Sequence, residues 1–279
     1  MPNDAPYNYV TVAAISDMGL VRTNNEDSFL SLPEAGLFVV ADGMGGGEAG
    51  EIASATVIDN LKQAGMASME DSPGARKYAI QQALHKANAK VVNYMQKNNF
   101  NSMGSTVVLM LLNPWNAEQA LVCHVGDSRI FCFRNGELFQ LTQDHSVGEE
   151  IRKKGLPQVP SKIAKALTRV IGGTGHLVPE WNDIAICPDD IYIICSDGIS
   201  PILSEEEMTQ IITATMQPEI IVKQLKQAVH AKGAPDNLTA VCIKTAHSLP
   251  LPADIDKWER EESDLLLKVA EERKDYGTN

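Results

Sequence analysis

Four aspartates stand where apolar, strand-like segments of the chain end or turn. Asp42 and Asp197 each follow an apolar run and directly precede a glycine. Asp236 precedes the last strand-like run, and Asp127 lies in the turn Gly126-Asp127-Ser128-Arg129. Each acid alone is unremarkable, because Asp-Gly and similar pairs are common turn signals. Together they form an all-oxygen ligand set without histidine or cysteine at comparable positions, which favours magnesium or manganese over zinc.

Such a ligand set suits the cleavage of a phosphate ester. Two divalent ions can share and acidify one water molecule and clamp the oxygens of an in-line displacement. Arg22, in a charged segment near the N-terminus, could bind two phosphate oxygens through its planar guanidinium group. An isolated arginine in a surface loop would need no such role. We therefore interpret the acids and Arg22 as one candidate site.

The glycine-rich stretch after Asp42 needs a separate test. Gly45-x-Gly47-x-x-Gly50 formally matches a dinucleotide-binding fingerprint. That fingerprint requires a second strand ending in an acid about 20 residues later, but residues 65–73 contain no apolar strand. Asp42 would repel a pyrophosphate, and the chain has no Gly-Lys-Ser/Thr for a P-loop. A nucleotide-binding fold is therefore disfavoured.

Length, charge and cysteines limit the classes of function. The 279 residues suffice for one large domain, with or without an appendage. The net charge of −12 opposes binding to nucleic acid or anionic membrane. The five cysteines form no CxxC pair, which predicts buried thiols in a reducing compartment. Since neither a secretory signal nor a run of membrane-spanning length is visible, we expect a soluble, cytoplasmic protein.

The elements that must position the acids follow from hydrophobic patterning. Residues 9–16 alternate like a half-buried strand, residues 17–29 resemble a charge-rich loop, and residues 37–42 form a buried strand. One helix is predicted after Glu48 and a longer one after Ser72-Pro73, an N-cap followed by proline. Four short strand-like runs separated by turns then predict an antiparallel meander; they cover residues 105–112, 119–125, 129–133 and 137–141.

The second half of the chain begins with an irregular, polar stretch over residues 144–175, which we interpret as a surface flap. A very apolar strand follows at residues 190–195, then a helix opened by the capping box Ser204-x-x-Glu207. A further helix and a last strand over residues 238–243 complete the pattern. Strands clustered in sequence, with helices in separate blocks, predict an α+β fold of stacked antiparallel sheets covered by helices.

A series of short motifs in fixed order resembles one known family. The motifs are Arg22-Thr23-Asn24-Asn25-Glu26-Asp27, Asp42-Gly43-Met44-Gly45-Gly46, Gly104-Ser105-Thr106, Gly126-Asp127-Ser128-Arg129, Asp144-His145-Ser146, Leu167-Thr168-Arg169, Ser196-Asp197-Gly198 and Asp236-Asn237-Leu238-Thr239. In this order they are similar to the metal-dependent serine/threonine protein phosphatases of type 2C, in their bacterial form. The resemblance covers about residues 10–245, and an ordered set is far more specific than any one motif.

The resemblance implies a four-layer αββα sandwich and a catalytic domain over residues 1–248, with the flap at about residues 144–175. It also implies two Mn²⁺ or Mg²⁺ ions per site. Asp42 would bridge the two ions, and the Gly43 carbonyl would bind one of them. Asp197 and Asp236 would complete the shell of the first ion. Arg22 would bind the phosphate.

Three further acids take roles from the same resemblance. Asp127 matches the ligand of a third, weaker ion, and Glu26 and Asp27 match acids that hold metal-bound waters. The implied reaction is hydrolysis of phosphoserine and phosphothreonine in proteins by a water that bridges the two ions. The implied partners are a phosphorylated protein and a cognate Ser/Thr kinase, with no nucleic acid and no membrane, and a monomeric chain is expected.

Two departures from the family pattern bear on mechanism. Many members have a histidine at the position of Met44 or of Gly47, and neither is histidine here. We expect a metal-bound water to donate the proton to the leaving group; His145 and His124 are the competing donors, although structural roles are favoured for both. The flap also lacks the His-Pro and Arg-Asn pieces common in bacterial relatives, so a different substrate choice is expected.

The C-terminal extension, residues 249–279, is charged, and its apolar residues make a helix plausible. We expect it to pack on its own domain or to be solvated rather than to dock a partner. Two alternatives to the main interpretation stay open: a catalytically silent family member that binds phosphoproteins, and a two-metal phosphodiesterase or nuclease. The complete set of acids opposes the first, and the negative charge opposes the second.

Overall fold

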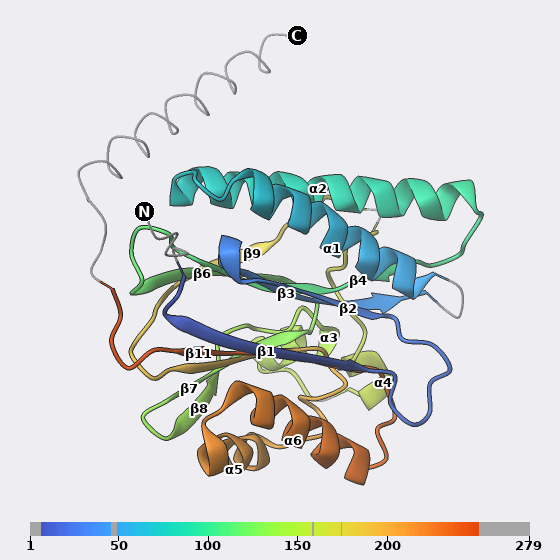
Figure 1. Cartoon of the computed structure of the whole chain (residues 1–279). Coiled ribbons are helices and arrows are strands. Elements are labelled where there is room, and N and C mark those ends of the chain that lie inside the picture. The colour runs from blue at the N-terminus through green and yellow to red at the C-terminus, as the bar shows by residue number, and fades with distance from the viewer. Residues whose placement is uncertain (1–6, 46–48, 158, 174, 251–279) are drawn as a thin grey trace.

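Two antiparallel sheets lie face to face in the computed structural model, and two helices cover each outer face (Figure 1). The structure describes residues 7–45, 49–157, 159–173 and 175–250. In spatial order, one sheet, here the β10 sheet, contains β1 (Val10–Asp17), β11 (Leu238–Thr245), β10 (Ile191–Cys195), β7 (Arg129–Arg134) and β8 (Glu137–Gln140). The other, the β3 sheet, contains β2 (Asp27–Leu32), β3 (Leu37–Met44), β5 (Val107–Leu112), β6 (Gln119–Val125) and β9 (Glu180–Ala185), with β4 (Gly104–Ser105) paired to β3. The predicted α+β sandwich is confirmed.

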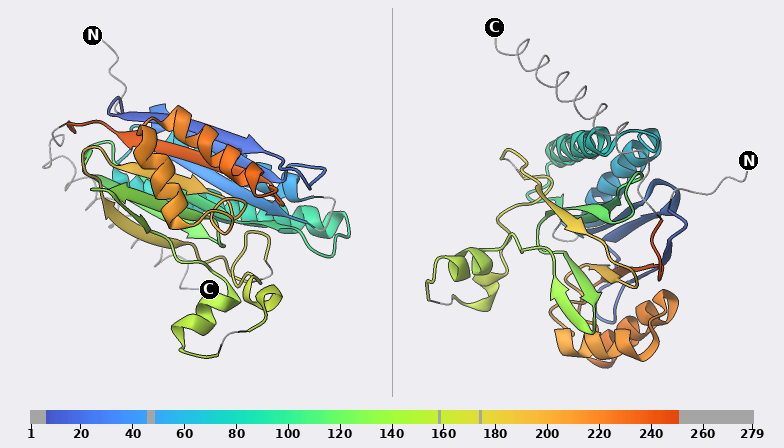
Figure 2. Two further views of the ribbon diagram at one scale, coloured as in Figure 1. Left: turned by 90° about the horizontal axis from the view of Figure 1, so that it is seen from below. Right: turned by 90° about the vertical axis from the view of Figure 1, so that its left-hand side faces the viewer.

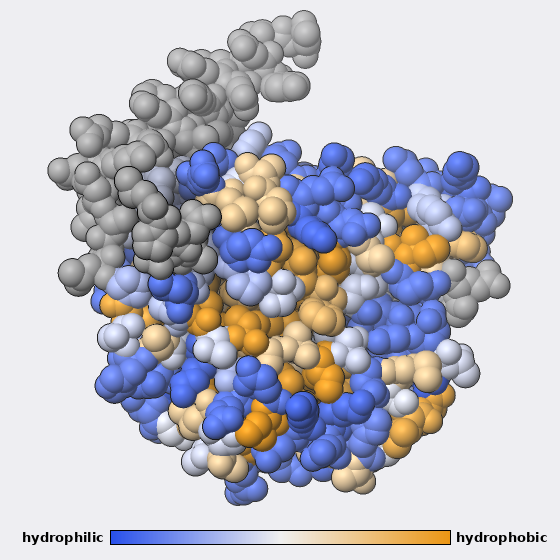
Figure 3. Space-filling model, in the orientation of Figure 1, coloured by the Kyte–Doolittle hydropathy of each residue, from blue (hydrophilic) through white to orange (hydrophobic). Residues whose placement is uncertain are grey.

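The helices bury one face each against a sheet. The β3 sheet is covered by α1 (Gly50–Ala67) and α2 (Pro73–Lys97), and the β10 sheet by α5 (Glu205–Thr215) and α6 (Pro218–Ala231). Apolar side chains fill three layers, one between the sheets and one under each helix pair. On the face in Figure 3, hydrophilic residues prevail over the outer helical layers, and apolar residues show mainly between them. The chain also contains η1 (Pro33–Ala35) and the flap helices α3 (Val147–Lys153) and α4 (Ser161–Ala164).

Local signals placed two helix starts correctly. The Ser72 hydroxyl accepts a hydrogen bond from the backbone N–H of Ala75, with proline following at the first helical position of α2. At α5, Ser204 and Glu207 form the reciprocal capping box that the sequence predicts. Both caps satisfy N–H groups that a helix leaves without intrahelical partners.

The predicted meander over residues 105–141 is confirmed for its first and last strand pairs but wrong for the pair between them. β5 and β6 pair in the β3 sheet, whereas β7 and β8 belong to the β10 sheet. The turn after β6 carries the chain from one sheet to the other, and Gly126 there has φ 107°. A Cβ on Gly126 would also collide with Thr106. Alternation along a strand shows which face is buried but not which sheet the strand joins, so the crossing was not visible in sequence.

Other boundaries also differ from the sequence predictions. The charge-rich loop ends at Glu26, because β2 begins at Asp27. The stretch expected to be irregular contains α3 and α4, which stand out from the sandwich in Figure 2. Strand β9, on the sheet edge, was not predicted. The C-terminal extension beyond Pro250 lies outside the described residues, so its helix and the domain boundary at 248 stay predictions.

Two bulk expectations can be compared with the structure. All five cysteines are free thiols, and four of them are buried. No helix in the part of the chain that the structure describes combines the length and apolarity needed to span a bilayer.

Candidate metal and phosphate site

The acids meet at one end of the sandwich because strands of both sheets end there. Asp27 opens β2 directly opposite Asp42 near the end of β3. Asp197 follows β10 and Asp236 precedes β11, and these strands are antiparallel neighbours, so the end of one lies beside the start of the other. Asp127 comes from the turn that crosses between the sheets. Sheet pairing therefore brings together residues that are far apart in sequence.

These residues surround one hollow of about 460 Å³. Its lining combines acids with two cations and backbone at the aspartate-glycine pair: Arg22, Glu26, Asp42, Gly43, Met44, Gly45, Asp127, Lys165, Leu167, Val170, Asp197, Asp236 and Asn237. Seven of the eight predicted site residues are thus on its wall. Asp27 is the exception: it lies behind the wall, is 8% exposed, and accepts a hydrogen bond from the Ser196 hydroxyl at 2.8 Å.

Close backbone approaches explain why glycine follows two of the acids. The Gly43 N–H donates to the Glu26 carbonyl at 3.1 Å, and a Cβ on Gly43 would collide with the Gly50 carbonyl. A Cβ on Gly198 would collide with the Asn237 carbonyl. The two Asp-Gly pairs are therefore packing requirements at the junction of segments, not simple hairpin turns.

The acids are crowded and short of positive charge. Burial, followed by the charges of Asp27, Asp197 and Asp127, raises the pKa of Asp42 well above its ordinary value. Burial and the charge of Asp197 raise the pKa of Asp127 to about 7. Burial above all raises the pKa of Asp27 to about 7 and raises that of Asp197. Buried carboxylates are stable as anions only when cations accompany them.

This donor set fits divalent metal ions. Five carboxylates and the Gly43 backbone line the hollow, and hard oxygen donors of this kind bind Mg²⁺ and Mn²⁺. Repulsion between neighbouring carboxylates contributes to their raised pKa values, and bound cations would neutralise this repulsion.

Arg22 lies at the rim of the hollow. Its Nη2 donates to Asp236 Oδ2 at 2.7 Å, and both side chains are partly exposed, by 49% and 36%. Exposed ion pairs contribute little to stability, so this pair can be exchanged for another anion at low cost. A guanidinium poised in this way can bind a phosphoryl group.

Asn237 organises the rim, and sequence reasoning assigned it no role. Its side-chain amide donates to the carbonyls of Met18 at 2.9 Å and Asn24 at 2.8 Å. Its Oδ1 accepts from the Glu26 N–H at 2.8 Å. These bonds fix the loop that carries Arg22 to the start of β11. The Asp-Asn pair before the last strand was a visible signal, but the atoms that it binds are more than 200 positions away.

Lys165 is the second wall residue that sequence reasoning missed. It belongs to the flap and is the other cation of the hollow, beside Arg22. Its charge lowers the pKa of Asp197, against the larger opposing effects of burial and Asp236. No sequence signal marked it, because isolated lysines in polar segments are common on surfaces.

His124 and His145 do not line the hollow. Their rings stack with centroids 4.3 Å apart, and Glu180 lies close enough for all three to hold a metal ion in principle. However, both ring nitrogens of His145 already have protein partners: the Gly126 N–H donates to Nδ1 at 3.2 Å, and Nε2 lies 3.2 Å from Glu180 Oε2 and 3.0 Å from Arg169 Nη1. Burial and His124 lower the pKa of His145 to about 4. The close approach of His124, His145 and Glu180 is explained by hydrogen bonds that join β6, the base of the flap and β9.

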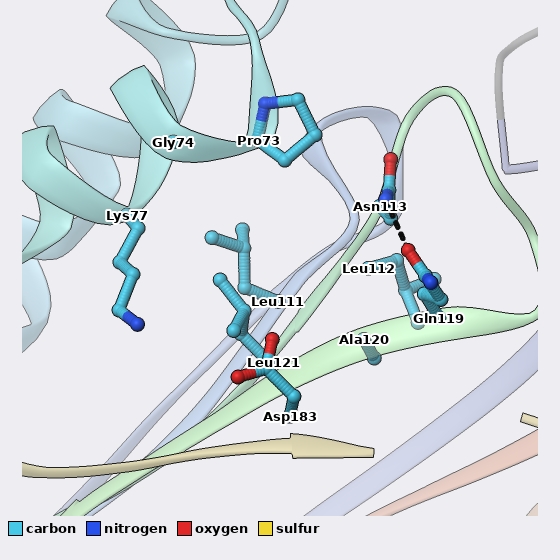
Figure 4. A pocket seen from close by; sticks show the side chains of 10 residues that line it. All are labelled: Pro73, Gly74, Lys77, Leu111, Leu112, Asn113, Gln119, Ala120, Leu121 and Asp183. Atoms are coloured by element: carbon cyan, nitrogen blue, oxygen red, sulfur yellow. Dashed lines mark hydrogen bonds between the residues drawn. The ribbon is translucent and has the colours of Figure 1, made fainter. Parts of the chain in front are cut away.

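A second hollow, of about 220 Å³, lies at the opposite end of the β3 sheet (Figure 4). There Leu112 pairs with Ala120, whereas Val107 pairs with Val125 near the acids. Leucines line this hollow, and its charged side chains are Lys77 and Asp183. One carboxylate and one ammonium group offer no multidentate metal site, so this hollow lacks the donor set of the acid-lined hollow.

A family model, a sequence relative and two solved structures match most of this chain. The sequence model of the family described as Protein phosphatase 2C matches residues 21–230. Protein phosphatase PhpP of Streptococcus pneumoniae is 28% identical over 241 residues, which cover 83% of this chain and 96% of PhpP. The structure of PppA, described as a key regulatory component of T6SS in Pseudomonas aeruginosa, superposes with a TM-score of 0.78 and 32% identity over 86% of this chain and 99% of PppA. The catalytic domain of the serine threonine protein phosphatase PstP, in complex with two manganese ions, gives a TM-score of 0.73 and 29% identity over 85% of this chain and 98% of that domain.

Proposed function

This chain belongs to the Protein phosphatase 2C family and is a serine/threonine protein phosphatase, and we propose that it acts through the acid-lined hollow. The observation that carries the proposal is the convergence of four aspartates from separate strand ends around one hollow with Arg22 at its rim. The substrate is a phosphoserine or phosphothreonine ester in a protein, as the names of its relatives state for those proteins.

We assign the metal ligands from the wall of the hollow. Asp42, the Gly43 carbonyl, Asp197 and Asp236 would hold two Mn²⁺ or Mg²⁺ ions, and Asp127 would serve a third. The PstP catalytic domain contains two manganese ions, and the donors here are of the type that such ions require. When bound, the ions acidify a water molecule and neutralise charge on the phosphoryl oxygens.

The remaining wall residues orient the substrate and solvent. Arg22 exchanges its exposed pair with Asp236 for two phosphoryl oxygens and holds the phosphorus in line for attack. Glu26, held by Asn237 and Ser54, accepts hydrogen bonds from water in the hollow. Asp27 supports Asp42 from the opposite strand.

Water in the hollow supplies the proton to the leaving alkoxide. Among the described residues that line the hollow there is no histidine. His145, one of the two candidate donors, has its pKa lowered to about 4 by burial and by His124. A histidine that is neutral at physiological pH and turned toward Glu180 is a poor general acid for this site.

Metal removal and one substitution test the function. A chelator should abolish hydrolysis of a phosphothreonine peptide, and added manganese should restore it. Asp42→Asn should lower kcat by at least about 10³-fold, equivalent to ~4 kcal/mol of barrier. Asp183→Asn, at the far end of the sheet, is the matched control. Full turnover by Asp42→Asn would refute the assignment, and tight peptide binding without turnover in manganese would instead favour a silent binding module.

The cellular setting is part of the same proposal. The free and mostly buried cysteines suit a reducing compartment, and we place the enzyme in the cytoplasm, where it reverses the action of a Ser/Thr kinase in signalling. We propose a monomer, which light scattering on a size-exclusion column would test against the chain mass of 30.3 kDa.

A further inference from the structure

The flap carries a surface that the catalytic proposal does not use. It leaves the sandwich at a short ladder, in which the Thr168 N–H donates to the His145 carbonyl at 2.8 Å and the Val147 N–H to the Ala166 carbonyl at 2.9 Å. Beyond this base, α3 and α4 stand away from both sheets (Figure 2). The flap therefore projects from the sandwich on a hydrogen-bonded base beside the catalytic hollow.

An apolar hollow of about 670 Å³ lies between the two flap helices. Ile151, Leu156, Val159 and Ala164 supply most of its apolar lining. Leu156 is 55% exposed, and Gly148 lies so close to Ala164 that a Cβ would sit 3.0 Å from the Ala164 Cβ. The hollow thus has a closely packed floor and an exposed apolar wall, which is costly in water unless a partner covers it.

The same flap is basic in an acidic protein. Residues 144–175 contain six lysines and arginines and three aspartates and glutamates, a net +3, although the whole chain carries −12. Arg152 pairs with Glu149 and Arg169 with Glu180. Four lysines, all exposed, have no carboxylate oxygen within 4.0 Å among the described residues: Lys153, Lys154, Lys162 and Lys165. Free cations gathered on one projection attract an acidic partner.

The flap hollow and the catalytic hollow have lining residues that are neighbours in the sequence. Ala164 lines the flap hollow and Lys165 lines the catalytic hollow, and consecutive Cα atoms are about 3.8 Å apart. An extended peptide advances about 3.3 Å per residue. A peptide with its phosphate among the acids therefore lies beside the flap, and the flap hollow is the apolar feature of the flap that a side chain close to the phosphate would meet.

We propose that the flap is a docking surface for the protein substrate and that it selects phosphosites with an apolar side chain nearby in an acidic segment. The apolar side chain enters the hollow beside Leu156, and the acidic residues face Lys153, Lys154 and Lys162. This inference rests on the proposed function and names its substrate class. A second copy of this chain is the rival occupant of the same surface.

The test uses matched phosphothreonine peptides with the full chain in manganese. One peptide carries a leucine and flanking glutamates, a second has serine for the leucine, and a third has glutamine for the glutamates. We expect kcat/KM to fall about 10-fold for the second peptide, in the range of a lost apolar contact. We expect a smaller fall for the third, which disappears at high salt because the lysines are exposed.

Variants assign these preferences to the flap. Leu156→Ser should remove the preference for leucine, and the double change of Lys153 and Lys154 to serine should remove the preference for glutamate. Lys223→Ser, an exposed lysine on α6, is the control and should keep both. Each value is expressed relative to turnover of p-nitrophenyl phosphate by the same variant, which corrects for any loss of active enzyme.

The outcomes separate the two proposals. Absence of p-nitrophenyl phosphate turnover in manganese would mean that the proposed function has failed. Normal turnover with equal rates on all peptides, or preferences that survive in the flap variants, would overturn the docking inference alone. It would also be overturned if Leu156→Ser changed only the oligomeric state in sedimentation, which would show that the hollow binds a second copy.

Discussion

Replacing Asp127 by asparagine should stabilise the metal-free protein above neutral pH. Burial, followed by the charges of Asp197 and Asp144, raises the pKa of Asp127 from 3.8 to about 7. Since one pKa unit is equivalent to about 1.4 kcal/mol, the ionised carboxylate costs the folded state ~4 kcal/mol at most. Asp127 is half-buried, so solvent screens part of this cost, and we expect a gain of about 1–3 kcal/mol.

The gain should depend on pH in a defined direction. In the unfolded chain Asp127 loses its proton near pH 3.8, but in the folded protein it does so near pH 7. Between these values the folded protein binds more protons, so the stability of the unmodified protein falls as pH rises. Asparagine removes this dependence. The benefit of Asp127→Asn should therefore grow between about pH 4 and about pH 7 and then become constant.

Urea unfolding in excess chelator at a series of pH values measures this benefit directly. Asp183→Asn, an exposed acid at the far end of the sheet, is the control and should show no such trend. A benefit that is independent of pH, or a loss of stability at alkaline pH, would refute the electrostatic account of the hollow. Added manganese should reverse the ranking, because an ion that binds only the folded state stabilises the protein with more ligands.

Three other changes have expected outcomes. Arg22→Lys should lower kcat/KM for a phosphopeptide by about 10–100-fold, because a lysine cannot make the two parallel bonds; unchanged kinetics would exclude Arg22 from phosphate binding. Gly198→Ala should lower the free energy of unfolding by ~2–4 kcal/mol, because its Cβ would meet the Asn237 carbonyl; an unchanged melting temperature would contradict this. His145→Ala should cost ~1–3 kcal/mol of stability, since it leaves the Gly126 N–H unpaired, yet keep the shape of the pH–rate profile; a lost acid limb would identify His145 as the proton donor.

Much of the fold was predictable because the relevant interactions are local. Ser72 and Ser204 are N-cap residues that form hydrogen bonds within the first helical turn, and such caps are recognisable in sequence. The fully apolar runs that became β3 and β10 are buried on both faces, as a strand between two layers must be. The stacking of antiparallel sheets covered by helices followed from the order of these segments, and the four-layer arrangement was implied by the family resemblance.

The features that were not predicted depend on contacts with segments far away in the sequence. The chain crosses between the sheets at Gly126, which the local pattern could not distinguish from a hairpin. Strand β9 is an edge strand with few fully buried residues, so its hydrophobic signal is weak. Asn237 lies in a recognisable motif and Lys165 in an ordinary polar segment, but the importance of both arises from distant residues that lie opposite them.

The sequence by itself determined the chemical character of the site: acids at strand ends, glycine beside two of them, and an arginine in a loop nearby. Only the tertiary structure decided that Asp27 lies behind the wall, that Lys165 and Asn237 line the hollow, and that the flap carries an apolar hollow. The reason is physical. Residue type and local spacing specify which groups can react, whereas sheet pairing between distant segments specifies which of them meet.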